Sequence, residues 1–177
     1  EPSRFHLSCP SREQAPNHPC QGPYTLDRSH VDIRGQTTWR GGTVSGGGDL
    51  HLRDVDALTV KDSTLADGDA HLTTGGDLTL DGLAVNGDAV LDSAGRISTG
   101  QDGMVSAQDL NATAVDGIQL NSALDSATLA VTGEGAIAVD NLGDLRVDNA
   151  TTSDGDINVD ASGDLGVGRV AANGAHD

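Results

Sequence analysis

Aliphatic residues alternate with polar ones in short stretches along most of the chain. Pairs such as Leu50/Leu52, Leu78/Leu80 and Ile157/Val159 are each separated by one polar residue. Each stretch ends at Gly, Asn, Asp or Ser after only a few residues. A period of two places both aliphatic residues of a pair on the same face of a β-strand. The pattern therefore predicts many short strands, each with one buried face.

The dipeptide Gly-Asp, followed by Leu, Ile or Ala, precedes many of these stretches. Its spacing alternates between steps of 8 residues and steps of 11 or 12, so a full unit is 19 or 20 residues long. A fixed period of this length is typical of a solenoid. Glycine allows the conformations of a tight corner, and an aspartate side chain accepts hydrogen bonds from corner amides. We assign Asp49, Asp69, Asp77, Asp88, Asp144, Asp156 and Asp164 to corners.

Short strands at this period predict an all-β fold, a right-handed parallel β-helix. Residues 25–177 provide about seven coils of roughly 20 residues each. Between residues 98 and 125 the alternation is less regular, and we expect a bulge or a shifted corner there. The competing fold, an antiparallel sandwich, also contains many short strands but does not explain the repeat period.

The first 24 residues differ in composition and are predicted to form an N-terminal cap or linker. All five prolines and both cysteines lie within the first 23 residues. The chain has one residue of each aromatic type, Phe5, Tyr24 and Trp39, and these suit a cap over the exposed end of a solenoid.

Cys9 and Cys20 offer two kinds of cross-link in this cap. Two cysteines in a proline-rich segment favour a disulfide formed in an oxidising compartment. His6 and His18 lie close to them in sequence, so a zinc site with two cysteine and two histidine ligands is the alternative.

The net charge of −17 is unevenly distributed. Residues 1–40 carry five arginines and four acids, a balance of +1, whereas residues 41–177 carry five basic and 23 acidic residues, a balance of −18. An acidic surface repels nucleic acid and anionic lipid, and the chain contains no apolar run of membrane-spanning length. We therefore expect neither nucleic-acid binding nor membrane insertion.

No pattern of residues predicts catalysis. Sugar-cleaving sites need a paired acid and base, usually beside aromatic platforms, yet no aromatic residue follows Trp39. The H-E-x-x-H and G-x-S-x-G motifs are absent. His51 and His71 are 20 residues apart, so we expect them to stack on adjacent coils in a solvent-facing row, with a metal site as the less favoured alternative. We expect no catalytic residue and no bound cofactor.

Calcium is the one cofactor that the corner aspartates suggest. Stacked carboxylates repel each other unless a cation bridges them. However, the G-G-x-G-x-D-x-U-x nonapeptide of calcium-binding rolls is absent, and Gly46 to Leu50 only imitates its opening. We take water to be the default neighbour of the corner aspartates and calcium to be the alternative.

Two segments carry a family resemblance. TTWRGGTVSGGGDL (residues 37–50) is similar to the T-x-W-x-G-G-T-[VL]-x-G-x-G-x-L stretch of large secreted bacterial β-strand-repeat adhesins. GAIAVDNLGDLRVDNATTSDGDINVDASGDLGVG (residues 135–168) resembles the filamentous haemagglutinin class of exoproteins, including those exported by two-partner secretion. The N-P-N-G-I and N-P-N-L signatures of the exported secretion domain are absent. The resemblance therefore implies the body or distal part of a long fibre, or a relative that uses another exporter.

The function that the resemblance implies is that of a secreted or cell-surface bacterial rod. Such a segment mediates attachment to a host, cell-surface or matrix ligand, in virulence or biofilm formation, or serves as a non-catalytic spacer. An alternative is a filament subunit whose coils stack end to end between chains, because the C-terminal VAANGAHD offers nothing like a cap. A β-helical polysaccharide-active enzyme is a further alternative, the least favoured by the residues.

Overall fold

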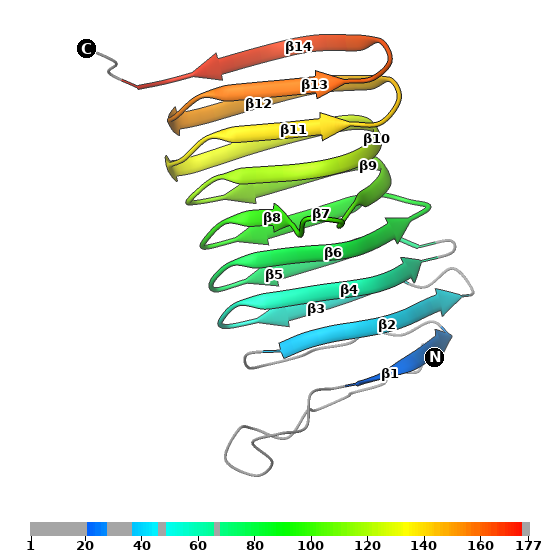
Figure 1. Cartoon of the computed structure of the whole chain (residues 1–177). Coiled ribbons are helices and arrows are strands. Elements are labelled where there is room, and N and C mark those ends of the chain that lie inside the picture. Colours follow the sequence, from blue (N-terminus) through cyan, green and yellow to red (C-terminus); the bar gives the residue numbers. More distant parts are fainter. Residues whose placement is uncertain (1–20, 28–36, 46–48, 66–67, 175–177) are drawn as a thin grey trace.

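The protein is a stack of short β-strands wound along one axis (Figure 1). The computed structural model describes residues 21–27, 37–45, 49–65 and 68–174, and the side chains of residues 49–64 and 68–174. These residues form strands, turns and bends, with no helix among them. The strands are β1 (Gln21–Asp27), β2 (Thr37–Ser45), β3 (Leu50–Asp54), β4 (Leu58–Leu65), β5 (Ala70–Thr74), β6 (Leu78–Val85), β7 (Ala89–Ser93), β8 (Ile97–Thr99), β9 (Val105–Ala114), β10 (Ile118–Glu134), β11 (Ile137–Asn141), β12 (Leu145–Asp154), β13 (Ile157–Ala161) and β14 (Leu165–Ala172).

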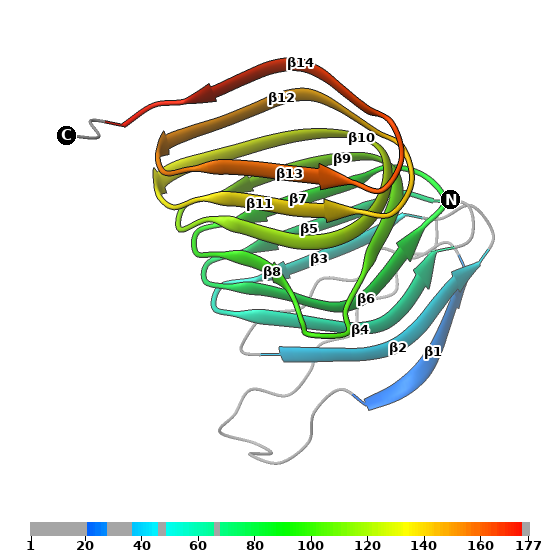
Figure 2. The ribbon, with the colours of Figure 1, turned by 45° about the horizontal axis from the view of Figure 1, so that its top comes forward.

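The strands form two columns, and every pair within them is parallel. The first column contains β1, β2, β4, β6, β8, β10, β11 and β13, and the second contains β3, β5, β7, β9, β10, β12 and β14. Figure 2 shows how the chain passes from one column to the other in each coil; the long β10 belongs to both, and the start of β9 also pairs with the end of β6. The predicted all-β solenoid of parallel strands is confirmed, with about six turns where the sequence predicts about seven. Residues 28–36, between β1 and β2, lie outside the described residues.

The strand register confirms the predicted period. Successive coils are offset by 20, 19, 21, 19 and 20 residues along one inward-facing row, which consists of Leu58, Leu78, Ile97, Ile118, Ile137 and Ile157. The one step of 21 residues spans the coil that contains a turn at residues 100–104.

The core is a stack of aliphatic side chains between the two columns. The first five residues of the row above are almost completely buried, and so is the facing row of Leu52, Leu72, Leu91, Ala112, Leu129 and Ala150. Burying a leucine or isoleucine contributes about 1.5–3 kcal/mol, so each coil adds a similar increment to the core. The alternation in the sequence therefore identifies the inward-facing residues correctly.

The coils change shape near the middle of the chain. β4 and β6 are eight residues long and bend at Asp62 and Gly82, which occupy matching positions with φ of 47° and 137°. β11 and β13 are only five residues long and turn earlier, so the strand that follows each of them is longer. Between these two shapes, β8 ends at Thr99 and the register shifts at Ala127/Thr128. This is the shifted corner that the irregular sequence at residues 98–125 predicts.

Candidate functional site

All seven predicted corner aspartates lie in turns between strands, immediately before the strand that follows. Asp49, Asp69 and Asp88 precede β3, β5 and β7, and the register of these strands places the three aspartates in one row. Asp77 precedes β6, and the remaining three precede β12, β13 and β14. The corner assignment is therefore correct.

Four of these carboxylates bind the main chain of the next coil. Asp49 Oδ1 accepts the N–H of Asp69 at 3.1 Å, and Asp69 Oδ1 accepts the N–H of Asp88 at 2.8 Å. Asp77 Oδ1 accepts the N–H of Arg96 at 2.9 Å. The last of the four bonds joins Asp144 Oδ1 to the N–H of Asp164 at 2.8 Å. These aspartates are exposed or half-buried, so they face water as expected, but each also links two coils, which the sequence analysis did not predict.

Glycine in the next coil makes room for three of these four carboxylates. A Cβ atom added to Gly87 would collide with Asp69 Oδ1, and one added to Gly163 would collide with Asp144 Oδ1. Gly95 stands in the same relation to Asp77. The two residues of Gly-Asp therefore have separate roles. The glycine leaves space for the aspartate of the preceding coil, and the aspartate that follows it binds the main chain of the next coil.

Three of the seven corner aspartates, Asp88, Asp156 and Asp164, lack such a bond within the described residues. Asp88 makes no such bond within the described residues, and the next coil carries Gln108 at the position that matches Gly87. Asp156 and Asp164 lie at the last described coil, so no further corner stands above them in the described chain. The bond thus requires both a following coil and a small residue at its corner.

The edge where the coils return from the second column to the first, which also carries Asp77 and Asp156, has a further set of polar residues that the sequence reasoning missed. Here the third inward position of the strand is a small polar residue, as at Thr74 and Ser93. Both hydroxyls donate to the carbonyl oxygen of Gly76, at 2.7 and 2.8 Å. Thr152 makes the matching bond to Gly155 O at 2.7 Å. The signal was present in the sequence for Thr74 and Ser93, because each follows two inward aliphatic or alanine residues at a spacing of two.

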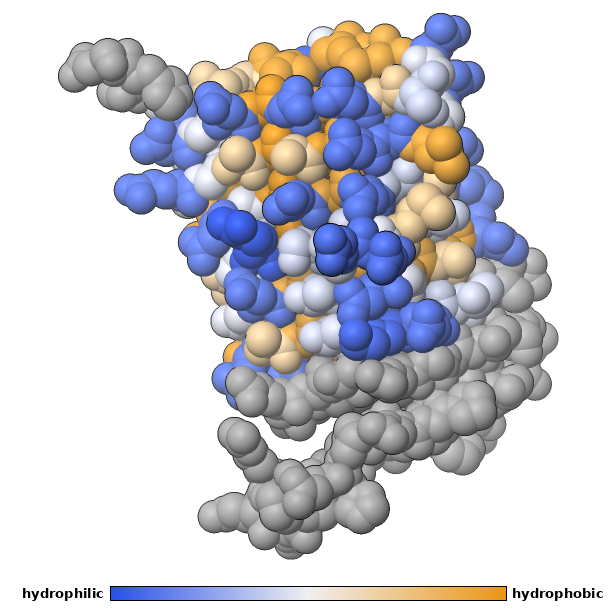
Figure 3. Space-filling model, in the orientation of Figure 1, coloured by the Kyte–Doolittle hydropathy of each residue, from blue (hydrophilic) through white to orange (hydrophobic). Residues whose placement is uncertain are grey.

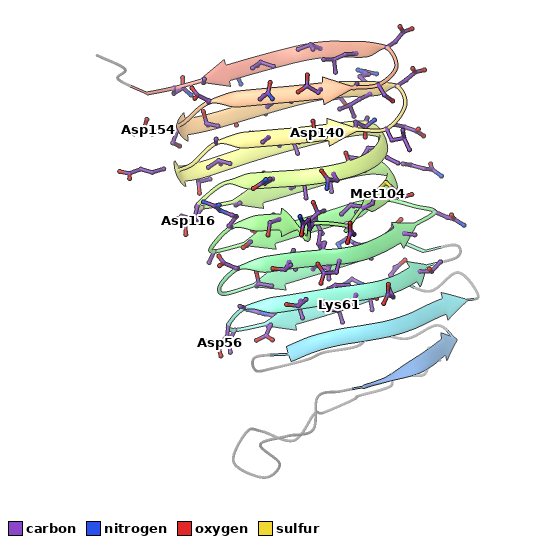
Figure 4. All side chains as sticks on the ribbon, viewed as in Figure 1. Asp56, Lys61, Met104, Asp116, Asp140 and Asp154 are labelled. Atoms are coloured by element: carbon purple, nitrogen blue, oxygen red, sulfur yellow. The ribbon has the colours of Figure 1, made fainter. Side chains whose placement is uncertain are left out.

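Acidic side chains line the outside of this edge. Figure 4 shows Asp56, Asp116 and Asp154 along one side of the stack, where the coils return from the second column to the first. Asp56 and Asp116 lie in turns, and Asp154 is the last residue of β12. A shallow notch at this edge is lined by residues 116–119 together with Arg96, Ala136 and Ala138.

Asn141 is a second residue that the sequence reasoning missed. It is only 4% exposed and lies where the chain turns away after β11. Its Oδ1 accepts the N–H of Leu124 at 2.9 Å, and its Nδ2 donates to Leu124 O at 3.2 Å and to Asp144 O at 3.1 Å. A primary amide offers the same donor and acceptor as a peptide group. The side chain therefore replaces the missing main-chain partner of Leu124 at the shifted corner.

His51 and His71 stack as predicted. Their ring centroids are 4.6 Å apart, the ring planes are within 3° of parallel, and both residues are half-buried on the outer side of β3 and β5. The next residue in this row is Val90, so the run of histidines ends at His71. Within the described residues, no group of three or more His, Cys, Asp or Glu side chains is placed to hold a metal ion.

Two ion pairs lie on the outer surface of the part of the chain whose side chains are described. Lys61, the chain's single lysine, pairs with Asp81 of the next coil, and the two residues are in register between β4 and β6. Arg146 Nε lies 2.8 Å from Asp148 Oδ1 in an exposed pair on β12. An exposed pair such as Arg146–Asp148 contributes at most about 1 kcal/mol.

The predicted cap residues are not described at side-chain level. Phe5, Cys9 and Cys20, with the alternative zinc ligands His6 and His18, lie outside the described residues. Tyr24 and Trp39 belong to β1 and β2, whose side chains are also outside them. The boundary at residue 24, the disulfide and the zinc alternative remain predictions.

The chain was compared with known proteins. No protein-family model, curated protein or solved structure matches the chain. No helix among the described residues is long and apolar enough to cross a membrane.

Proposed function

We propose that this chain is a non-catalytic rod segment of a secreted or surface-anchored bacterial fibre protein, of the filamentous haemagglutinin-like kind that its repeats resemble. Its role is attachment to a host, cell-surface or matrix ligand, or spacing between such a ligand and the cell. The observation that carries the proposal is that four of the seven corner aspartates bond one coil to the next.

The bonding pattern suits a long, rod-shaped structure. Each coil adds parallel main-chain pairing, a pair of aliphatic rows and, at most corners, a carboxylate-to-amide bond. Hydrogen bonds to a charged acceptor are roughly twice as strong as neutral ones. Stability of such a solenoid grows with the number of coils, because each repeat contacts only its neighbours.

The outer surface is compatible with exposure to solvent along the whole rod. The row in register with Thr59 on the first column continues with Thr79, Ser98, Gln119, Ala138 and Asn158, all of them polar except Ala138. The net charge of −17 keeps such rods apart and soluble.

Two measurements on the source organism test the location and the role. Gold-labelled antibodies against the chain, applied to intact cells, should label material outside the cell envelope, and deletion of the gene should reduce attachment to host cells or to a coated surface. Labelling confined to the cell interior, or attachment unchanged by the deletion, contradicts the proposal.

A third measurement tests the absence of catalysis. The purified chain is incubated with a panel of neutral and acidic polysaccharides, and new reducing ends and unsaturated sugars are followed over time. We expect no release above a heat-denatured control. Turnover that disappears on heating would favour the polysaccharide-active alternative.

A further inference from the structure

Two Asn-Ala-Thr tripeptides occupy matching places on the solenoid. Residues 111–113 lie in β9 and residues 149–151 lie in β12. Asparagine followed two residues later by threonine, with any residue except proline between them, is the acceptor pattern for N-linked sugar. We propose that Asn111 and Asn149 are glycosylated. The proposal goes beyond the rod role, because it assigns a covalent modification to one face of the rod.

The strands direct the acceptor groups of both tripeptides outward. Side chains two residues apart lie on the same face of a strand. In both tripeptides the alanine is completely buried, whereas Asn111 is exposed and Asn149 is half-buried. Both threonines are half-buried on the same outer face as the asparagines. The amide and the hydroxyl of each tripeptide therefore face away from the core, and the alanine helps to fill it.

The two amide groups are also free to be modified. Within the described residues, the side chains of Asn111 and Asn149 make no hydrogen bond. Each of the other asparagines with a described side chain has an interaction partner, and these are Asn86, Asn121, Asn141, Asn158 and Asn173. A sugar on Asn111 or Asn149 thus replaces no contact of the fold, whereas a sugar on Asn141 would disrupt the shifted corner.

The two sites lie in one row on the outer side of the second column. Thr128 of β10 is in register with Asn111 on one side and with Asn149 on the other. Neighbouring strands of a sheet are about 4.8 Å apart, so the two asparagines are separated by about 10 Å along the axis. Sugars attached to both project side by side from the same face.

These sugars cover one face of the rod and leave the opposite face open. Figures 1 and 2 show β9 and β12 behind the strands of the first column. Figure 3 shows the outer side of the first column, with hydrophilic side chains on successive coils. Charged residues of this side include Lys61, which pairs with Asp81, and Asp140 further along the axis (Figure 4). The charged face therefore stays accessible when the sites are occupied.

The modification needs a transferase and a sugar donor with a diphosphate leaving group. The asparagine Nδ2 forms a bond to the anomeric carbon of the sugar, and the bond between that carbon and the diphosphate oxygen breaks. The diphosphate leaves with the electron pair, and the amide nitrogen gives up one proton to a base of the transferase. The product is a neutral amide that carries one sugar on Nδ2.

Peptide masses of the chain isolated from its source organism test the proposal. Trypsin cleaves after lysine and arginine, so residues 97–146 and 147–169 become separate peptides. Each contains one tripeptide and at least one asparagine outside it, such as Asn121 or Asn158. We expect both peptides to be heavier than their sequences by whole sugar residues. Fragmentation that preserves the bond between sugar and amide should place the added mass on Asn111 and Asn149.

Two matched substitutions, expressed in the source organism, test the dependence on the tripeptide. Thr113→Val removes the hydroxyl and keeps the branched shape, whereas Thr113→Ser keeps the hydroxyl. The sugar on Asn111 should be lost with Thr113→Val and retained with Thr113→Ser. Asn149 should stay modified in both variants, which shows that each variant chain still reaches the transferase. Circular dichroism checks that the strands are kept.

The other outcomes overturn the proposal. Peptides with the masses of their sequences mean that neither asparagine is an acceptor. Sugar that remains on Asn111 after Thr113→Val shows that the tripeptide does not direct the transfer. Sugar found on serine or threonine hydroxyls, or on Asn121 or Asn158 instead, assigns the modification to other residues. These masses are read independently of cell attachment, so their failure is distinct from a failure of the rod role.

Discussion

Asp69 Oδ1 lies 2.8 Å from the main-chain nitrogen of Asp88, the residue at the same corner of the next coil. The same aspartate donates its own main-chain N–H to Asp49 Oδ1, one coil earlier. Each corner is therefore both donor and acceptor, and the bonds run along the axis of the solenoid. The N–H groups placed between the stacked carboxylates offset part of their mutual repulsion.

Replacing Asp69 with alanine and with asparagine separates the hydrogen bond from the charge. Asp69→Ala leaves the Asp88 N–H without its acceptor, and we expect a loss of about 1 kcal/mol in the free energy of unfolding. Asp69→Asn keeps an acceptor oxygen and removes one of three stacked charges, so it should be neutral or slightly stabilising. Urea unfolding followed by circular dichroism measures both, and equal stability of the two variants would contradict the bonding role.

Gly87 should tolerate no side chain, because its Cα lies against the Asp69 carboxylate and the Gly68 carbonyl. Gly87→Ala is expected to cost about 1–3 kcal/mol, as overpacking does elsewhere. Gly166 is the matched control, since it also lies in this solenoid but no atom approaches a Cβ there closer than 3.9 Å. Gly166→Ala should change stability by less than about 0.5 kcal/mol. Unfolding midpoints measure both variants, and equal stability of the two would contradict the prediction.

The same contact predicts coupling between the two residues. In the Asp69→Ala background the side chain that collides with a Cβ at position 87 is shorter, so Gly87→Ala should cost less there than in the wild-type chain. The four unfolding free energies of the double-mutant cycle give the coupling directly. Strict additivity would mean that the Gly68 carbonyl alone excludes the methyl group.

The repeat in the sequence predicts the fold because period and alternation are both local signals. The two-residue alternation identifies Leu50, Leu52, Leu78 and Leu80 as inward-facing, and the recurrence of Gly-Asp identifies the corners. The partner of each aspartate is harder to predict, because it lies 19 or 20 residues away and depends on the register between coils. Once that register is known, the glycine before the next corner residue follows as a requirement of space.

Asn141 shows what a repeat pattern hides. Its sequence context, Val139-Asp140-Asn141-Leu142-Gly143, looks like an ordinary corner. Its role arises only because the corner moves between the coil of β10 and the coil of β11, which leaves the peptide group of Leu124 without a main-chain partner above it. That displacement is a property of two neighbouring coils together, so no single repeat encodes it.

Removing the Asn141 amide should weaken the hydrogen bonding between coils around Leu124. Asn141→Ala leaves the buried N–H and C=O of Leu124 unpaired, at an expected cost of about 1–3 kcal/mol for each such group. Asn141→Asp should also destabilise, because a carboxylate oxygen would then face two carbonyl oxygens, those of Leu124 and Asp144. Amide hydrogen exchange resolves the effect, with faster exchange at Leu124 expected in both variants.

The control for this pair is Asn158→Ala. Asn158 lies on an exposed position of β13, and its amide reaches only the side chain of Asp160. Its removal should change stability by less than about 0.5 kcal/mol. If Asn141→Ala were as mild as Asn158→Ala, with unchanged exchange at Leu124, the asparagine would not be replacing a main-chain partner.

Calcium should not stabilise the solenoid specifically. At four of the seven corners one carboxylate oxygen is already bound to a main-chain N–H, and the described residues hold no group of three or more potential metal ligands. A specific site with a dissociation constant of roughly 10⁻⁴ M, in the range of extracellular calcium modules, would raise the unfolding free energy by about 2–3 kcal/mol in roughly 5 mM Ca²⁺. We expect instead the same small shift in melting temperature with Ca²⁺, with Mg²⁺ and with NaCl of equal ionic strength, because all three only screen the acidic surface. Thermal unfolding in the three salts, measured for the wild-type chain and for Asp69→Asn, tests this prediction. A rise in melting temperature seen with Ca²⁺ alone and lost in the variant would reveal a cation bridging the stacked corners.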